Sequence, residues 1–224
     1  VIVTAVSHLA HNPSYNRVFC FTEGDTAQIA EIVAWFRERQ VRMWFDIVPP
    51  LVSQGTLRVL ESEGLYLSRF TDIVYAEPVS FQSQYGGDLS IQQIESGQSF
   101  GDFAQVLSLA FEIPMEIVDQ TEHFTQIEYS HPRWRRYLAF VDGRPASLAC
   151  VFTGEQATSI AVMGTVSEYR NRGCQSALIR QCIADAAEAG SDLVVSQTGS
   201  GSTSERNMIR AGFQVAYTKM LWTN

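Results

Sequence analysis

A strand, a short glycine-containing loop and a long helix follow one another between residues 158 and 189, and this succession constrains the fold more than any other part of the chain. Residues 158–166 are apolar on both faces, as expected of a central strand. One face would carry Ile160, Val162, Gly164 and Val166, and the other Ala161, Met163 and Thr165. A helix is predicted over residues 173–189, with Gly190 ending it. Its apolar stripe consists of Leu178, Cys182, Ile183 and Ala186.

The strand is the third of a predicted antiparallel meander. Strands over residues 137–141, 146–153 and 158–166 are separated by turns at Asp142-Gly143 and Gly154-Glu155. A strand over 89–94 and a helix over 103–111 precede the meander. The elements that follow the long helix are a strand over 193–197, a helix over 202–211 and a last strand over 213–222. The pattern indicates a mixed α/β domain over residues 89–224, with a central mixed sheet flanked by helices.

The N-terminal part also alternates strands and helices. We predict strands over residues 16–21, 41–48, 66–70 and 72–75, and helices over 26–40 and 55–62. In the first helix Ile29, Ile32, Val33 and Phe36 recur on one face. Residues 77–88 contain Pro, Ser, Gln and Gly without periodicity, which favours a domain boundary there. Residues 1–80 would then form a separate domain.

Composition excludes several function classes. The net charge of −8 argues against nucleic acid as the main partner, because phosphate neutralisation needs clustered Lys and Arg. The local basic cluster at residues 131–136 is either a solvated loop face or a subsite for an anionic ligand. No apolar run is long enough to cross a membrane, and the N-terminus does not read as a secretory signal.

The four cysteines form neither a CxxC pair nor a metal-ligand spacing. We therefore expect no metal, and reduced cysteines packed as small hydrophobes in a cytoplasmic protein. Cys174 allows a second interpretation, a thiol nucleophile near a helix N-terminus, where the thiol pKa would fall. No histidine lies near it in the sequence to serve as its base.

The loop between the third meander strand and the long helix is the main candidate for a ligand site. The first turn of a helix presents backbone N–H groups without intrahelical partners, and these favour phosphate. Gly173 would let the backbone approach a ligand closely, and Arg170 and Arg172 would add positive charge. Many such units bind nothing, however. Neither a GxxxxGK[ST] loop nor a GxGxxG fingerprint is present.

Residues 170–175, Arg-Asn-Arg-Gly-Cys-Gln, resemble the Q/R-x-x-G-x-G/A loop of the GNAT superfamily of acyl-CoA-dependent N-acyltransferases. The preceding strand, the following helix and Ala211-Gly212-Phe213 before the last strand agree with this family in order and spacing. The resemblance covers residues 89–224. Gln175 departs from the usual Gly or Ala at its position.

The resemblance implies a GNAT-like fold that uses acetyl-CoA to acetylate an amine. The coenzyme-binding positions it implies are Met163, Gly164 and Thr165 on the strand, Arg170, Asn171, Arg172, Gly173, Cys174, Gln175 and Ser176 in the loop, and Ser204 or Asn207 on the later helix. A strand glycine such as Gly164 is also explained by close packing. The acceptor would be a small-molecule amine or an exposed amino group. A homodimer is compatible with the sequence.

The residues that would perform proton transfer depart from the family pattern. Met208 occupies the position where the family often has a tyrosine that acts as general acid. Ser204, Glu205 and Asn207 are nearby polar alternatives. Glu112, Glu116 and His123 are candidate bases, but each is also explained as a solvated residue, so the catalytic residues stay unassigned. Two alternatives therefore remain, an acyl-CoA-binding regulatory module without turnover and a transferase of another acyl group. Residues 1–80 resemble a degenerate, non-catalytic part of the same fold.

Overall fold

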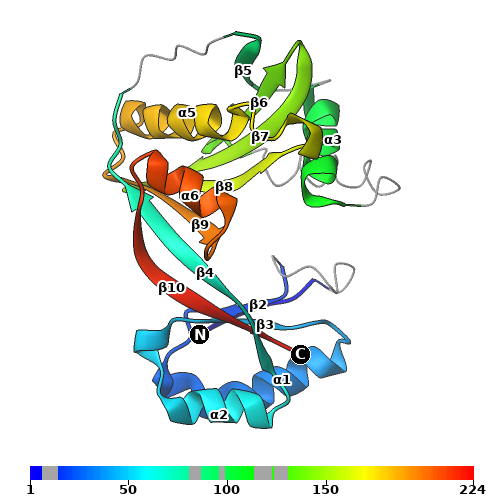
Figure 1. The fold of residues 1–224 in the computed structure, drawn as a ribbon. Coiled ribbons are helices and arrows are strands. Elements are labelled where there is room, and N and C mark those ends of the chain that lie inside the picture. Colours follow the sequence, from blue (N-terminus) through cyan, green and yellow to red (C-terminus); the bar gives the residue numbers. More distant parts are fainter. Residues whose placement is uncertain (7–14, 81–86, 96–98, 114–122, 124–130) are drawn as a thin grey trace. The chain divides into compact units, whose positions relative to one another are not determined.

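The structure is a computed structural model that describes residues 1–6, 15–80, 87–95, 99–113, 123 and 131–224. It divides into two compact units (Figure 1). The first unit contains Val1–Ile73, Thr198–Ser202 and Val215–Asn224, and the second contains Val74–Gln197 and Thr203–Gln214. This division differs from the expected one, because most of the last strand groups with the N-terminal unit rather than with residues 89–214.

The first unit combines a sheet with two helices. Its strands are β1 (Ile2–Thr4), β2 (Arg17–Phe19), β3 (Trp44–Ile47), β10 (Gln214–Thr223) and β4 (Tyr66–Ala76), in this order across the sheet. β2 and β3 are parallel, whereas β1 is antiparallel to β2 and β10 is antiparallel to β3. β4 is continuous where two separate strands were predicted. Strand β1 was not predicted at all.

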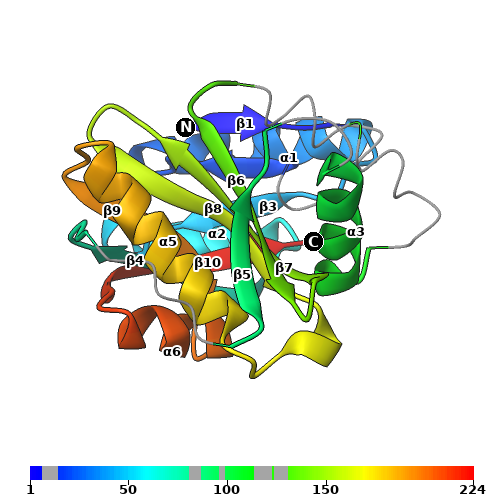
Figure 2. The same cartoon turned by 90° about the horizontal axis from the view of Figure 1, so that it is seen from above.

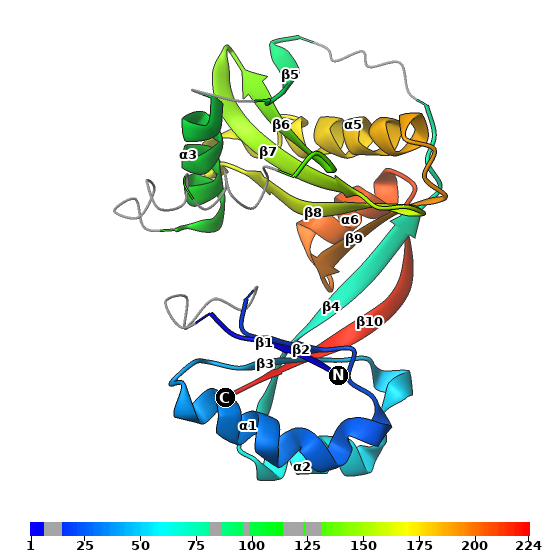
Figure 3. The same cartoon turned by 180° about the vertical axis from the view of Figure 1, so that it is seen from behind.

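Helices α1 (Ile29–Glu38) and α2 (Gln54–Ser62) cover one face of this sheet (Figure 3). A 3₁₀ turn, η2 (Glu23–Gln28), replaces the predicted start of the first helix. The predicted apolar stripe is confirmed, since Ile29, Ile32, Val33 and Phe36 are all buried. They pack with Phe45 and Ile47 of β3, whose side chains point to this face. Trp44 and Asp46 alternate with them and therefore lie on the other face.

The second unit contains the predicted meander. Its strands β5 (Leu89–Gln93), β6 (Trp134–Val141), β7 (Arg144–Thr153) and β8 (Ala157–Thr165) pair antiparallel in sequence order. β9 (Leu193–Gly199) then pairs parallel to β8. At the β6–β7 turn, Asp142 and Gly143 both have positive φ angles, 52° and 74°, as a tight hairpin turn requires.

Helices pack on both faces of this sheet (Figure 2). α5 (Cys174–Glu188) and α6 (Thr203–Arg210) contribute to a core on one face. α3 (Ser99–Phe111) contributes to the core on the other face, through Phe103 and Val106. The mixed α/β class predicted from the sequence is confirmed. Within the described part of the chain, no helix is long and apolar enough to span a membrane.

Candidate functional site

Strand β8 changes its pairing in the middle. Cys150 of β7 pairs with Val162, whereas the next residue, Val151, pairs with Ile160, so Ala161 is an extra residue that forms a β-bulge. Because of the bulge, the side chains on either side of Ala161 point to opposite faces of the sheet. Ile160 packs in the core under α5, whereas Val162 packs in the core under α3. The prediction that both side chains share one face is therefore wrong. A bulge cannot be read from an alternating pattern.

The same point ends the contact between β8 and β9. The parallel ladder runs from Ala157 opposite Leu193 to Ile160 opposite Ser196 and goes no further. Residues 162–165 continue to pair with β7 but leave β9. The second edge of β8 is thus without a paired strand in this stretch, as far as the structure is described. Met163, Gly164 and Thr165 all lie in this diverging segment, where an extended ligand could add backbone hydrogen bonds.

Gly164 faces the end of α3. A Cβ placed on it would lie 2.9 Å from Cβ of Ala110 and 2.8 Å from Cε2 of Phe111. Close packing against α3 therefore accounts for a glycine at this position. This was the second of the two explanations offered for Gly164 in the sequence analysis. The hydroxyl of Ser147 donates a 2.7 Å hydrogen bond to the carbonyl of Gly164 and lies 2.8 Å from Oγ1 of Thr165. These contacts fix the backbone of the diverging segment.

The loop before α5 exposes the start of the helix. Asn171 and Gly173 have φ angles of 64° and 83°, so two left-handed residues turn the chain into the helix. No side chain caps this helix, and its first turn has no acidic residue. The N–H groups of Cys174, Gln175 and Ser176 precede the first intrahelical bond, which Ala177 N donates to the Gly173 carbonyl at 3.0 Å. The arrangement is suited to a phosphate group.

The cations of this loop are exposed, and one is paired. Arg172 Nη1 lies 3.0 Å from Oδ2 of Asp142, which belongs to the β6–β7 turn. Both side chains are exposed, so the ion pair contributes little to stability. Arg172 can therefore exchange the Asp142 carboxylate for another anion. Arg170 is also exposed. The loop therefore offers two guanidinium groups near an open helix N-terminus.

Gln175 points toward α6. Its Nε2 donates a 2.9 Å hydrogen bond to the Ser204 hydroxyl, and its Oε1 accepts a 2.6 Å bond from Nδ2 of Asn207. The structure thus brings together three of the predicted coenzyme-binding residues. Oδ1 of Asn207 also accepts a bond from Arg210. Because these bonds occupy the Asn207 amide, its side chain links the helices in this structure.

Two sequence-based alternatives lose support. Cys174 is buried, and desolvation raises the pKa of its thiol, which disfavours the thiolate that a nucleophile requires. The basic cluster at residues 131–136 lies near the other end of α5, where Arg135 pairs with Glu188 at 3.3 Å. This helix of 15 residues is about 22 Å long. The cluster therefore does not adjoin the loop before α5.

The structure describes several of the residues that the sequence offered for proton transfer, and it assigns that role to none of them. Met208 is 1% exposed and belongs to the core, so its side chain serves packing. Glu112 follows α3 and is exposed, with a φ angle of 57°. His123 is exposed as well, and Glu116 lies outside the described residues. Among the residues that the structure describes, no group of three or more His, Cys, Asp or Glu side chains is placed to hold a metal ion.

No family model and no curated protein matches the sequence. Solved structures do match the fold. A GCN5-related N-acetyltransferase from Sphaerobacter thermophilus is 18% identical with a TM-score of 0.70, over 87% of this chain and 66% of that one. A functionally unknown conserved protein from Staphylococcus epidermidis is 12% identical with a TM-score of 0.73, over 99% and 89%. A tandem GNAT protein from the clavulanic acid biosynthesis pathway is 14% identical with a TM-score of 0.68, over 88% and 68%.

These similarities establish the fold. The chain has the fold of the GCN5-related N-acetyltransferases, as the loop at residues 170–175 predicted. The Staphylococcus protein shows that nearly the whole chain, first unit included, has a counterpart of known structure. The chain spans 66% of the length of the Sphaerobacter protein. At identities this low, fold similarity does not fix function.

Proposed function

We propose that this chain, which has the fold of the GCN5-related N-acetyltransferases, is an acetyl-CoA-dependent N-acetyltransferase. The single observation that carries the proposal is the open N-terminus of α5, which follows a strand that has just separated from its neighbour. In this proposal the pyrophosphate lies on the N–H groups of the loop and the first turn of α5. The acyl-bearing arm then extends along the free edge of β8, beside Met163, Gly164 and Thr165.

The chemistry is a direct transfer in a ternary complex. The nitrogen of a neutral primary amine attacks the thioester carbonyl and the C–S bond breaks. The departing thiolate takes up the proton that the amine loses, directly or through solvent, which gives the amide and the free thiol. Holding the amine and the thioester together in one site lowers the barrier by about 7–11 kcal/mol at most. In this proposal a backbone N–H on the free edge of β8 polarises the thioester oxygen. The acceptor is a small molecule or an exposed amino group.

The first unit is proposed to be non-catalytic. Its η2 turn, which leads into α1, carries two carboxylates in its own first turn, Glu23 and Asp25. Glu23 accepts hydrogen bonds from the Thr56 hydroxyl at 2.6 Å and from the Ser53 backbone at 2.5 Å. Asp25 accepts a 2.8 Å bond from the backbone of Thr22. These negative charges would repel a phosphate, whereas the first turn of α5 has no acidic residue.

Binding of acetyl-CoA, followed by isothermal titration calorimetry, tests the proposal. The informative variant is Gly173→Ala, because a methyl group there narrows the approach to the loop. Gly190→Ala is its matched control: Gly190 is also left-handed, with a φ of 70°, and its Cβ would also meet open space, but it lies at the other end of α5. Each change should cost about 1 kcal/mol of stability. Only Gly173→Ala should also weaken acetyl-CoA binding, by about tenfold or more.

Failure of the wild-type protein to bind acetyl-CoA at millimolar concentration would rule out the proposal. A second candidate function, an acyl-CoA-binding regulatory module without turnover, is favoured by the buried Met208 at the position of the family's acid. Release of free thiol across a panel of amines separates the two, because saturable turnover excludes the inactive module. Mass spectrometry of a co-purified ligand would identify a different acyl group.

A further inference from the structure

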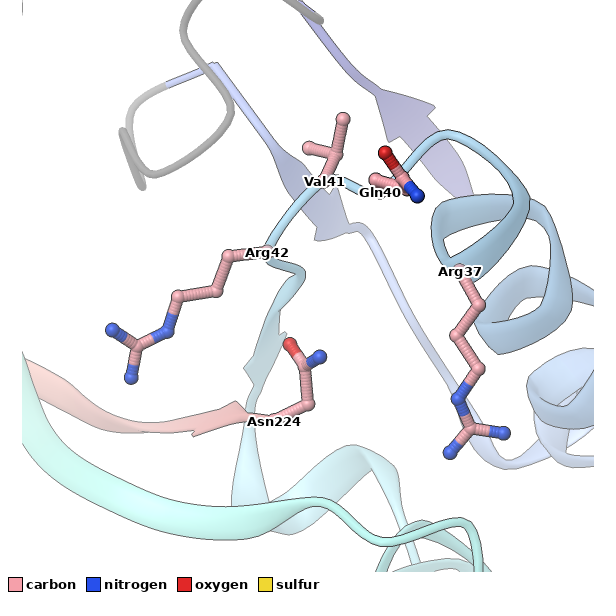
Figure 4. Close-up of a pocket in the computed structure, with 5 residues that line it drawn as sticks. All are labelled: Arg37, Gln40, Val41, Arg42 and Asn224. Atoms are coloured by element: carbon pink, nitrogen blue, oxygen red, sulfur yellow. The ribbon is translucent and has the colours of Figure 1, made fainter.

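A pocket of about 500 Å³ opens on the first unit. None of the residues that line it belongs to the loop before α5. Arg37, Gln40, Val41, Arg42 and Asn224 line it (Figure 4). Figure 4 shows Arg37 and Arg42 on opposite sides of the Asn224 side chain. The lining has two guanidinium groups and two amides but no carboxylate side chain. Among the lining side chains, hydrogen-bond donors therefore predominate.

Arg42 is held in place by uncharged groups. Its Nε donates a 3.2 Å hydrogen bond to the Thr223 hydroxyl, and its Nη2 donates a 3.1 Å bond to the hydroxyl of Tyr66. Its guanidinium carbon lies 4.8 Å from the centre of the Trp44 ring. These three contacts fix the guanidinium while leaving its Nη1 group as a donor. An arginine that is already ordered loses little entropy when it binds an oxyanion.

A second guanidinium shares the same ring. The Arg69 carbon lies 5.6 Å from the centre of Trp44, so two positive charges lie close to one indole. In the described part of the chain, neither Arg42 nor Arg69 forms an ion pair. Arg37 is only partly compensated, by Glu63 at 3.7 Å. Positive charges gathered around one ring repel one another unless an anion lies near them.

Two other cations of the same sheet, Arg17 and Lys219, are paired with a carboxylate. Arg17 makes a forked ion pair with Asp46, with Nη2 at 2.6 and 2.7 Å from the two carboxylate oxygens. Lys219 lies 2.7 Å from the same carboxylate. The chain as a whole is acidic, with a net charge of −8. Uncompensated arginines around Trp44 are therefore a local feature and not a consequence of composition.

We propose that the pocket at Arg42 binds the oxyanionic group, phosphoryl or carboxylate, of a small molecule. Arg42 supplies the main contact, and Arg37 and Arg69 supply additional positive charge. The side-chain N–H₂ of Asn224 is a further donor, because its Oδ1 already accepts a 3.1 Å bond from the backbone of Met43. All five lining residues belong to the first unit, and none of them is among the coenzyme-binding positions proposed for the second unit.

Calorimetric titration of the full chain with pyrophosphate and with citrate, at low ionic strength, tests this site. The variants are Arg42→Gln and, as a matched control, Arg58→Gln, which removes an exposed charge from α2 of the same unit. We expect Arg42→Gln to weaken binding about tenfold or more and Arg58→Gln to change it less than about twofold. Whether pyrophosphate or citrate binds more tightly distinguishes the two oxyanion sources.

Two further measurements locate the bound anion. Arg172→Gln removes a cation of the loop before α5 and should leave this binding event unchanged. The buried indole N–H of Trp44, which has no hydrogen-bond partner among the described residues, should shift in an NMR spectrum as the anion binds. If Arg42→Gln proves unstable, the exposed Arg69→Gln variant should still weaken binding. No saturable binding of either anion, or equal affinities for the Arg42→Gln and Arg58→Gln variants, would overturn the proposal.

Discussion

Asn207 donates a 2.6 Å hydrogen bond from its side-chain amide to Oε1 of Gln175, which joins α6 to the first turn of α5. At the position where GNAT loops usually have Gly or Ala, this chain has a longer side chain that turns toward α6. The bond from Gln175 to the hydroxyl of Ser204 completes the link. The departure from the family pattern therefore has a structural role.

Replacing Gln175 by Ala should lower the free energy of unfolding by about 1–2 kcal/mol, because two partly buried hydrogen bonds are lost. Urea denaturation measures the change, with the exposed Gln156→Ala variant as control. Binding of acetyl-CoA should persist, since the backbone amides of the loop would hold the phosphates. Complete loss of binding in a folded Gln175→Ala protein would show that the side chain itself contacts the coenzyme.

Gly164→Ala should destabilise the second unit by about 1–3 kcal/mol, because the new methyl group overlaps the end of α3. The overlap with Ala110, at 2.9 Å, cannot be relieved by rotating a side chain. Combining the change with Ala110→Gly should therefore recover part of the loss. Thermal or urea denaturation of the two single variants and the double variant gives the coupling energy. Strict additivity would contradict the proposed contact.

Asp142→Asn should strengthen coenzyme binding by up to about fivefold, because an exposed ion pair contributes about 0.2–1 kcal/mol. The change frees Arg172 to contact the ligand and keeps a residue that tolerates the positive φ of the turn. Calorimetry at low and high salt tests it, and the gain should shrink at high salt. Weaker binding in the variant would mean instead that Asp142 orients Arg172.

Asp185 should make stability depend on pH. Burial raises the pKa of this carboxyl, although hydrogen bonds from Tyr137 and Gln181 and the nearby Arg135 act in the opposite direction and Glu188 acts in the same one. The folded state therefore binds the proton more tightly than the unfolded state. The stabilisation from this group is greatest below about pH 4, the ordinary range of an Asp, and is lost as the pH rises through the raised pKa.

Asp185→Asn removes this proton-binding group. The free energy of unfolding of the variant, relative to the wild type, should therefore increase as the pH rises above about 4. Chemical denaturation at a series of pH values measures the difference, and the exposed Asp192→Asn serves as control. A difference that stays constant with pH would contradict the assignment.

The local elements and the candidate loop could be predicted from the amino-acid sequence. Apolar periodicity located α1 and α5, and turn residues located the β6–β7 hairpin, because these features depend on residues close together in the chain. Gly173 was likewise identified as the residue that opens the start of α5, and its φ of 83° agrees with this. The order of strands and helices predicted the fold class, and the loop at residues 170–175 together with that order carried the GNAT resemblance.

Contacts between residues that are distant in the sequence became visible only in the folded chain. Lys219 joins Asp46 across 173 positions of sequence, which assigns the end of β10 to the first unit. The bulge at Ala161 depends on the register with β7, and the direction of Gln175 depends on α6. Each of these is set by pairing and packing between segments far apart in the chain. Such contacts leave no periodic trace in a single sequence.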